Sequence, residues 1–196
     1  LWEGYDVMEV ATPQGFASNP ELVLDFYNQR RRQLFEVEPN QAHIDLASLE
    51  KNYKVTIVTQ NVDDLHERAG SRKVLHLHGE LLKVRSSVDP DYILEWKKDL
   101  SQTDFCVHGQ PLRPHIVWFG EQVPAITEAE TILAKADVVA IIGTSLQVYP
   151  AANLIHSAPA TTPVFYIDPN PSHTPAHVNV IAKKATLGVP EFINLI

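Results

Sequence analysis

Residues 54–82 read KVTIVTQNVDDLHERAGSRKVLHLHGELL, and this stretch decides the fold. It begins with a β-branched run at residues 55–59, of the kind that is buried in a parallel sheet. A second apolar run follows at residues 74–77. Both runs end in polar residues, the first at Gln60 and the second at His78. Ligands bind at the carboxyl ends of strands in open α/β sheets, so the sequence predicts a site at these two strand ends.

Each of these polar endings also has an ordinary structural explanation. A histidine in an apolar run is more often a hydrogen-bonded core residue than a base, and Asn61 and Asp63 after a strand commonly form a turn. Gln-Asn-x-Asp and His-Gly occur here together, however. Their combination favours a catalytic cluster of amide, carboxylate and imidazole groups.

The sequence resembles a known family in four blocks. TQNVDDLHERAG and HLHGEL lie within the central stretch, RPHIVWFGE covers residues 113–121, and IIGTSLQVYPAA covers residues 141–152. These blocks resemble the signature core of the sirtuins, the NAD-dependent protein deacylases, and they follow one another in the family's order. The resemblance is closest to the bacterial and mitochondrial class that removes acidic acyl groups.

Composition restricts the class of protein further. The chain has 196 residues, 44% of them hydrophobic, with a formal net charge of −8. That charge disfavours a sequence-independent grip on nucleic acid or on an anionic membrane, and no apolar run approaches the ~20 residues of a membrane span. The only cysteine is Cys106, which suits a reducing compartment. We therefore expect a cytoplasmic protein with no nucleic-acid or membrane partner, and the resemblance implies a bacterial source.

Hydrophobic periodicity predicts the remaining elements. Residues 1–16 show no sustained period and are expected to be mostly loop. A helix is expected from Pro20 and a second one from Asn40 to Glu50. Further expected elements are an extended run at 115–119, strands at 137–142 and 164–167, and helices after Asp63, at 127–136, opening at 149–153, and from 189.

Alternating strands and helices predict an α/β fold with a doubly wound, Rossmann-like parallel sheet. Residues 1–196 are expected to form a single sirtuin-type catalytic domain, with a small lobe inserted from about 16–41 and 83–112. Sirtuins normally open with a strand and a glycine-rich phosphate-binding loop. This chain begins at Leu1 and Trp2, so the resemblance implies that the N-terminal βα unit is missing.

The small lobe lacks the family's usual metal ligands. Most sirtuins carry Cys-x-x-Cys twice in this region, because a structural zinc site needs four ligands. Here Ser86 and Ser87 stand where the first thiolates are expected, and only Cys106 remains. We therefore expect no metal. The lobe would be held by its apolar side chains, namely Tyr92, Ile93, Leu94, Trp96, Leu100 and Phe105.

Two segments are candidates for binding the substrate, an acyl-lysine protein or peptide. Tyr27 and Arg30 are neighbours on the first long helix, and the resemblance implies that this pair binds a carboxylate at the end of an acyl chain. The alternative is a solvated basic helix face at residues 30–32. The extended run at 115–119 is expected to pair with a peptide strand or, alternatively, to be a core strand with Trp118 and Phe119 packed inside. The implied peptide-binding residues are Val117, Phe119, Gly120 and Glu121.

The resemblance also implies the cofactor site and the chemistry. NAD would lie across the strand ends, where small or polar residues allow close approach of the backbone. Its implied ligands are Gln60, Asn61, Val62, Asp63, Gly143, Thr144, Ser145, Asp168, Pro169, Asn170 and Ala185. The catalytic residues would be His78, as general base for a ribose hydroxyl, with Asn61 and Asp63 orienting ribose and water. The products would be free lysine, nicotinamide and O-acyl-ADP-ribose.

Two other functions remain open from the sequence. One is an NAD hydrolase or ADP-ribosyl transferase that uses the same His78 with another nucleophile. The other is a non-catalytic module that binds NAD or an acyl-peptide. The completeness of the Gln-Asn-x-Asp, His-Gly and Phe-Gly-Glu blocks favours an enzyme over a decayed module.

Overall fold

The computed structural model describes residues 4–171 and 175–196. The chain forms two compact units. Unit 1 comprises Leu1–Glu38, Gln60–Asp64 and His78–Val123; unit 2 comprises Pro39–Thr59, Leu65–Leu77 and Pro124–Ile196. The predicted lobe segments, 16–41 and 83–112, fall almost wholly in unit 1, but the division into a single domain with a lobe stays a prediction. Leu1 and Trp2, on which the prediction about the start of the chain rests, lie outside the described residues.

Unit 2 contains two parallel sheets. β1 (Ile57–Thr59) pairs with β2 (Val74–His76), and the other sheet has the order β6 (Val139–Ile142), β7 (Val164–Ile167) and β8 (Val178–Ile181). Parallel pairing confirms the expected α/β class. β8 was not predicted, because Val178 and Ile181 are buried while Asn179 and Val180 between them are exposed, which gives no run of either period.

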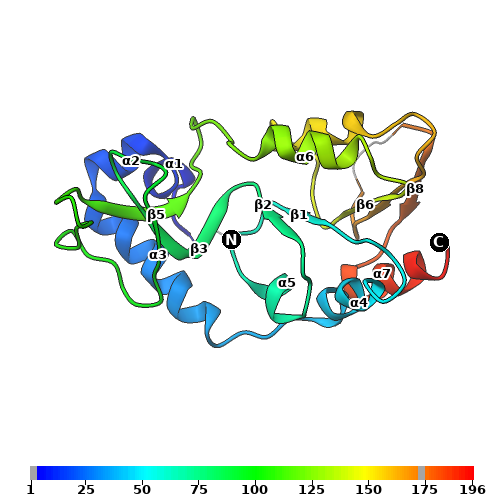
Figure 1. Ribbon diagram of the computed structural model, residues 1–196, viewed down its shortest axis with the longest axis horizontal. Coiled ribbons are helices and arrows are strands. Elements are labelled where there is room, and N and C mark those ends of the chain that lie inside the picture. The colour runs from blue at the N-terminus through cyan, green and yellow to red at the C-terminus, as the bar shows by residue number, and fades with distance from the viewer. Residues whose placement is uncertain (1–3, 172–174) are drawn as a thin grey trace. The chain divides into compact units, whose positions relative to one another are not determined.

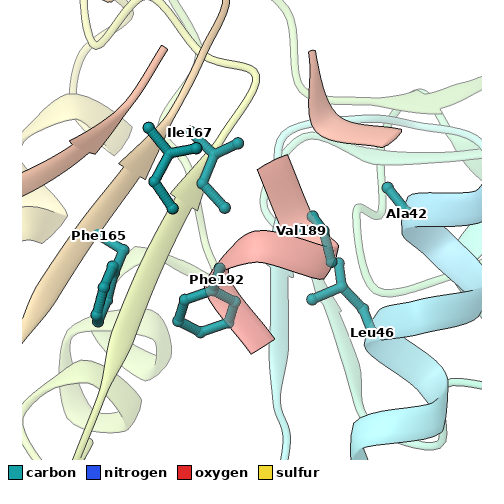
Figure 2. Close-up of a cluster of buried hydrophobic side chains, with 7 residues drawn as sticks. Ala42, Leu46, Phe165, Ile167, Val189 and Phe192 are labelled. Atoms are coloured by element: carbon teal, nitrogen blue, oxygen red, sulfur yellow. The ribbon is translucent and has the colours of Figure 1, made fainter. Parts of the chain in front are cut away.

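Helices cover both faces of the three-stranded sheet of unit 2, as a doubly wound fold requires (Figure 1). On one face, Phe165 and Ile167 of β7 pack against α4 (Gln41–Leu49) and α7 (Ala185–Ile193). In Figure 2 the side chains of Leu46 from α4 and Val189 from α7 point toward one another. The alternate residues of β7 face η1 (Ala151–Ser157), beside α6 (Ile126–Leu133). The two-residue period of β7 therefore builds a core on each face.

Unit 1 combines a helical segment with an antiparallel sheet (Figure 1). α1 (Val7–Val10), α2 (Pro13–Ser18) and α3 (Pro20–Leu34) come first along the chain. The sheet has the order β4 (Ile93–Glu95), β3 (Gly79–Ser86) and β5 (Leu112–Ile116). The short helix α5 (Leu65–Arg68) belongs to unit 2, where it follows the polar ending of β1.

The long helix α3 begins where the sequence predicts. Asn19 caps it by accepting a hydrogen bond from the Leu22 N–H (3.2 Å), and Pro20 occupies the first turn. Its buried side includes Arg31, which is 1% exposed and donates from Nε to the carbonyl of Leu81 in β3 (3.0 Å). The solvated-face alternative for residues 30–32 is therefore wrong for Arg31, which ties the helix to the sheet.

A cluster of apolar side chains fills the part of unit 1 in which the family's zinc ligands are usual. Its buried members are Leu24, Val84, Leu100, Cys106 and Leu112, with Phe16, Tyr92, Leu94 and Trp96 packed against them. Ile93 and Phe105 were expected in this cluster, but both are exposed, because they point away from it on β4 and in the loop after it. Ser86 is buried and accepts hydrogen bonds from the Val88 and Asp89 N–H groups, so it stabilises a turn.

Several predicted boundaries are wrong. Residues 1–16 were expected to be mostly loop, yet α1 and α2 form there; Asp6 and Thr12 cap them, a signal that periodicity misses in such short helices. The C-terminal helix begins at Ala185 and not at residue 189, so Pro190 lies inside it. The extended run expected at 115–119 is replaced by β5, which ends at Ile116.

Candidate active site

His78 lies between β2 and β3, and its ring orientation is fixed by the polar ending of β1. Its Nδ1 is 3.2 Å from the main-chain carbonyl oxygen of Gln60. A carbonyl oxygen only accepts, so Nδ1 carries the proton, and in the neutral ring Nε2 keeps its lone pair. Burial lowers the pKa of His78 below its usual value, partly opposed by the hydrogen bond to Gln60. The imidazole is therefore neutral near pH 7 and can accept a proton at Nε2.

The loop that follows β1 lies beside His78 within unit 1. The Leu81 N–H of β3 donates to the carbonyl of Val62 (2.7 Å), and this bond holds the loop against the strand that follows His78. Asn61 is exposed on the loop and Asp63 is half-buried. The structure thus brings the predicted catalytic residues into one short region, as the two strand endings suggested.

Tyr27 and Arg30 are neighbours on α3, also in unit 1. Tyr27 is buried, and its hydroxyl accepts a hydrogen bond from Trp118 Nε1 (2.9 Å). Burial raises the pKa of Tyr27, with smaller opposing effects from this bond and from nearby guanidinium groups. The Arg30 guanidinium lies 3.6 Å from the centre of the Phe26 ring and donates to the Phe26 carbonyl (3.0 Å). The tyrosine is thus a protonated phenol with a cation close to it.

Aromatic rings continue from this pair to the segment after β5. Phe26 and Tyr27 contact edge to face at 5.0 Å, and Tyr27 and Trp118 lie 6.4 Å apart between centroids. The Phe16 ring also contacts Trp118, with the ring centroids 5.2 Å apart. Phe26, Tyr27 and Trp118 are almost completely buried, so these rings form an aromatic cluster around Tyr27 of the predicted acyl site.

A charged cluster holds the segment that carries Trp118. The Glu121 carboxylate accepts two hydrogen bonds from Arg113 (2.7 and 3.1 Å) and one from the Trp118 main-chain N–H (2.8 Å). Arg85 adds weaker contacts to the same carboxylate (3.3 and 3.4 Å). Burial alone would raise the pKa of Glu121, but these partners lower it overall.

No role in the site was predicted for Trp118, Arg113 or Arg85, and Glu121 was predicted to bind peptide. The signal available was the charged pair that flanks Trp118 within residues 113–121. Of the two aromatic residues expected inside, Trp118 is buried, but Phe119 is 46% exposed because the chain turns there.

The main chain after β5 has its N–H groups already engaged. The Val117 N–H donates to the carbonyl of His78 (2.9 Å), and the Phe119 N–H donates to Ala11 (3.0 Å). Within the described part of the chain, the Val117 carbonyl accepts no hydrogen bond. An N–H group of a bound peptide could therefore donate a hydrogen bond to the main-chain carbonyl oxygen of Val117.

The remaining predicted NAD ligands lie in unit 2, at the carboxyl ends of its parallel strands. Gly143 directly follows β6, and its N–H donates to Ile167 at the end of β7 (2.9 Å). Among the residues that the structure describes, none lies within 4 Å of a Cβ built at Gly143, so the main chain there is accessible to a ligand as far as these residues are concerned. β6 is followed, after Gly143, by Thr144 and Ser145, and β7 is followed by Asp168, Pro169 and Asn170. The first residue of α7 is Ala185. This second group of predicted residues is thus gathered at one sheet edge, in a different unit from His78.

Over residues 4–171 and 175–196, no group of three or more His, Cys, Asp or Glu side chains is arranged to hold a metal ion. Across the same residues, no helix combines the length and apolarity that a membrane span requires.

Comparison with known proteins identifies the family. A sequence profile described as the Sir2 family matches residues 1–150. The chain belongs to the Sir2 family. The sirtuin resemblance of the four sequence blocks is thereby confirmed.

Relatives within the Sir2 family are close in sequence and in structure. An NAD-dependent protein deacylase of Helicobacter pylori is 58% identical over 187 residues, which are 94% of this chain and 82% of that protein. A solved Sir2 homologue in complex with NAD has a TM-score of 0.86 and 38% identity, over 100% of this chain and 79% of that one. A Sir2 protein bound to an acetylated peptide has a TM-score of 0.78 and 29% identity, over 95% and 81%. These likenesses confirm the Rossmann-like α/β fold.

Proposed function

We propose that this Sir2 protein is an NAD-dependent protein-lysine deacylase, with His78 as its general base. The observation that carries the proposal is the bond between His78 Nδ1 and the Gln60 carbonyl (3.2 Å), which leaves Nε2 free to accept a proton. The lowered pKa of the half-buried ring keeps it neutral near pH 7. The deacylase name of a relative at 58% identity supports the same activity.

The predicted NAD ligands have the chemistry that a dinucleotide needs. Gly143, with its open main chain, suits close approach of a phosphate or ribose. One oxygen of Asp168 accepts from the Asn170 N–H (2.8 Å), and a carboxylate has further lone pairs for ribose hydroxyls. We therefore propose that the NAD ligands of unit 2 are Gly143, Thr144, Ser145, Asp168, Pro169, Asn170 and Ala185. For unit 1, the predicted ligands stay Gln60, Asn61, Val62 and Asp63. A relative solved in complex with NAD supports NAD as the cofactor.

Bound NAD supplies an electrophilic ribose carbon and nicotinamide as leaving group. The chain's own residues would prepare the reaction around that carbon. His78 Nε2 would take a proton from a ribose hydroxyl, and Asn61 and Asp63 would orient ribose and water by hydrogen bonds. The Val117 carbonyl would accept the amide N–H of the acyl-lysine, and Phe119, Gly120 and Glu121 would flank the peptide. The acyl oxygen would displace nicotinamide at the ribose carbon and water would release the lysine, so that the products would be nicotinamide, free lysine and O-acyl-ADP-ribose.

We further propose that the acyl site accepts acidic acyl groups such as succinyl. Arg30 lies one helical turn after Tyr27 on α3, and its charge lowers the pKa of the buried phenol slightly, against the larger effect of burial. A guanidinium and a phenol can bind a terminal carboxylate together. The surrounding rings of Phe26 and Trp118 exclude water, which strengthens a charged hydrogen bond. Cytoplasmic location and the absence of a nucleic-acid or membrane partner stay predictions.

The decisive experiment incubates the protein with NAD and matched acetyl-lysine and succinyl-lysine peptides, and follows each peptide by mass. Loss of an acyl group only when NAD is present would support the deacylase. Release of nicotinamide with intact peptides would instead support an NAD hydrolase or transferase. Peptide binding without either reaction would favour a non-catalytic module.

A further inference from the structure

The hydroxyl of Tyr27 has a defined hydrogen-bond direction. An indole N–H can only donate, so the Tyr27 oxygen accepts at 2.9 Å from Trp118 Nε1. The phenol still carries its own proton, which it can only donate. Trp118 thus occupies the acceptor side of the hydroxyl, and the proton is directed away from the indole.

That remaining proton has no acceptor in the structure. Among residues 4–171 and 175–196, the bond from Trp118 is the single hydrogen bond of the Tyr27 side chain. The residue is 5% exposed, and burial raises its pKa, so the phenol stays protonated at neutral pH. A buried donor without an acceptor costs free energy until a ligand supplies one.

The indole itself is held on several sides. The Arg113 guanidinium lies 3.5 Å from the centre of the Trp118 ring, and Phe16 packs at 5.2 Å. Glu121 accepts from the main-chain N–H of Trp118 (2.8 Å) and, at the same time, pairs with Arg113 (2.7 Å). The indole ring is therefore held by contacts with Arg113 and Phe16 in addition to its hydrogen bond to Tyr27.

We propose that Trp118 is a positioning residue for acyl selectivity, whose N–H orients the Tyr27 hydroxyl so that its proton points toward an acidic acyl group. The inference rests on the proposed deacylase function and names a determinant of its substrate class. A terminal carboxylate offers acceptor oxygens to this donor, whereas an acetyl group ends in a methyl. Loss of the indole N–H should therefore lower kcat/KM for succinyl-lysine peptides more than kcat/KM for acetyl-lysine peptides.

A double-mutant cycle tests the proposal with four proteins: wild type, Trp118→Phe, Tyr27→Phe and the double variant. For each, kcat and KM are measured on succinyl-lysine and acetyl-lysine peptides of one sequence at saturating NAD. Trp118→Phe should lower the succinyl-to-acetyl ratio of kcat/KM by about 3- to 10-fold, mainly through KM for the succinyl peptide. In the Tyr27→Phe background the same change should alter the ratio by less than about 2-fold, because Trp118 acts through Tyr27.

Trp96→Phe is the matched control. Trp96 also donates its indole N–H to a protein oxygen, the carbonyl of Asp99 (3.2 Å), but it belongs to the apolar cluster of unit 1 and not to the acyl site. Its loss should leave the succinyl-to-acetyl ratio unchanged. If Trp118→Phe does not fold, benzothienylalanine at position 118 replaces the N–H with sulfur and keeps the ring size.

The outcomes separate this inference from the proposed function. The positioning role alone is overturned if the wild type deacylates but Trp118→Phe leaves the succinyl-to-acetyl ratio of kcat/KM unchanged. It is also overturned if Trp118→Phe lowers this ratio equally in the wild-type and Tyr27→Phe backgrounds. A wild type that deacylates neither peptide overturns the proposed function, and the inference with it.

Discussion

The imidazole of His78 hydrogen-bonds through Nδ1 to the main-chain carbonyl oxygen of Gln60, over a distance of 3.2 Å. The partner is a main-chain atom that does not titrate. The ring tautomer is therefore set by the backbone at the end of β1, and no second ionisable side chain is needed to maintain it. Because Gln60 directly precedes Asn61, the same turn of chain orients the base and carries the polar residues beside it.

Replacement of His78 with alanine should abolish most deacylation. Removing a positioned general base typically costs a factor of about 100 or more in turnover. The side chain is half-buried and makes one hydrogen bond, so the fold should survive, which a melting curve checks. His108→Ala is the matched control, since His108 is exposed in the same unit. Equal activity of the His78 variant and wild type would exclude His78 as the base.

The pH dependence of kcat/KM should show the lowered pKa of His78. The base acts when neutral, and burial lowers its pKa below the usual value of about 6.5. Activity on an acetyl peptide should therefore persist below pH 6.5 and fall only as the pH drops through the lowered pKa. A profile that is already falling at pH 7.5 would contradict a neutral, buried base.

Much of the fold follows from local signals in the sequence. β7, the start of α3 and the Asn40 cap of α4 lie where periodicity and capping residues place them. The two short helices before α3 were missed because four to six residues are too few to show a 3.6-residue period.

Part of the candidate site likewise follows from the sequence, and part depends on contacts between distant residues. His78 and Asp63 are suggested by residue type and by their position at strand ends. Neighbouring positions on one helix face were evident for Tyr27 and Arg30, but their assignment as an acyl site depends on the family resemblance. The hydrogen bond between Trp118 and Tyr27 could not be predicted, because it joins residues 91 positions apart in the sequence. Long-range pairing of this kind is decided by tertiary packing and leaves no periodic signal.

Arg30→Met should lower the succinyl-to-acetyl ratio of kcat/KM by about 10-fold or more, since hydrogen bonds to a charged group contribute about 1.5–3 kcal/mol. Methionine keeps the apolar stem against Phe26 and removes the cation. Arg32→Met is the control, because Arg32 on the same helix is exposed and pairs with Asp99 (2.6 Å). Parallel losses on both peptides would indicate a structural role for Arg30.

Glu121→Gln should destabilise the protein by about 1–3 kcal/mol at pH 7, because the carboxylate accepts from Arg113 and from the Trp118 main chain. Its folded pKa is lowered, so its stabilisation is complete above the unfolded value of about 4.3 and is lost as the pH falls through the folded pKa. In urea unfolding, the gap between variant and wild type should therefore narrow from pH 7 to pH 4. Asp99→Asn is the control: it removes an exposed ion pair and should lower the free energy of unfolding by at most about 1 kcal/mol. A stability difference between Glu121→Gln and wild type that grows in acid would refute the pairing of Glu121 with Arg113.

Gly79→Ala should destabilise the protein strongly, because β3 passes close to β5 at this residue. A Cβ at Gly79 would lie 2.0 Å from the His115 carbonyl oxygen, and its φ of +82° disfavours any side chain. Gly109→Ala separates the two effects, since Gly109 has a φ of +71° and nothing within 4 Å. Denaturant unfolding should give about 1–2 kcal/mol for Gly109→Ala, from the left-handed backbone alone, and a clearly larger loss for Gly79→Ala, which must also move one strand. Equal losses in the two variants would mean that β3 and β5 separate easily at this point, and that Gly79 is required only for its backbone conformation.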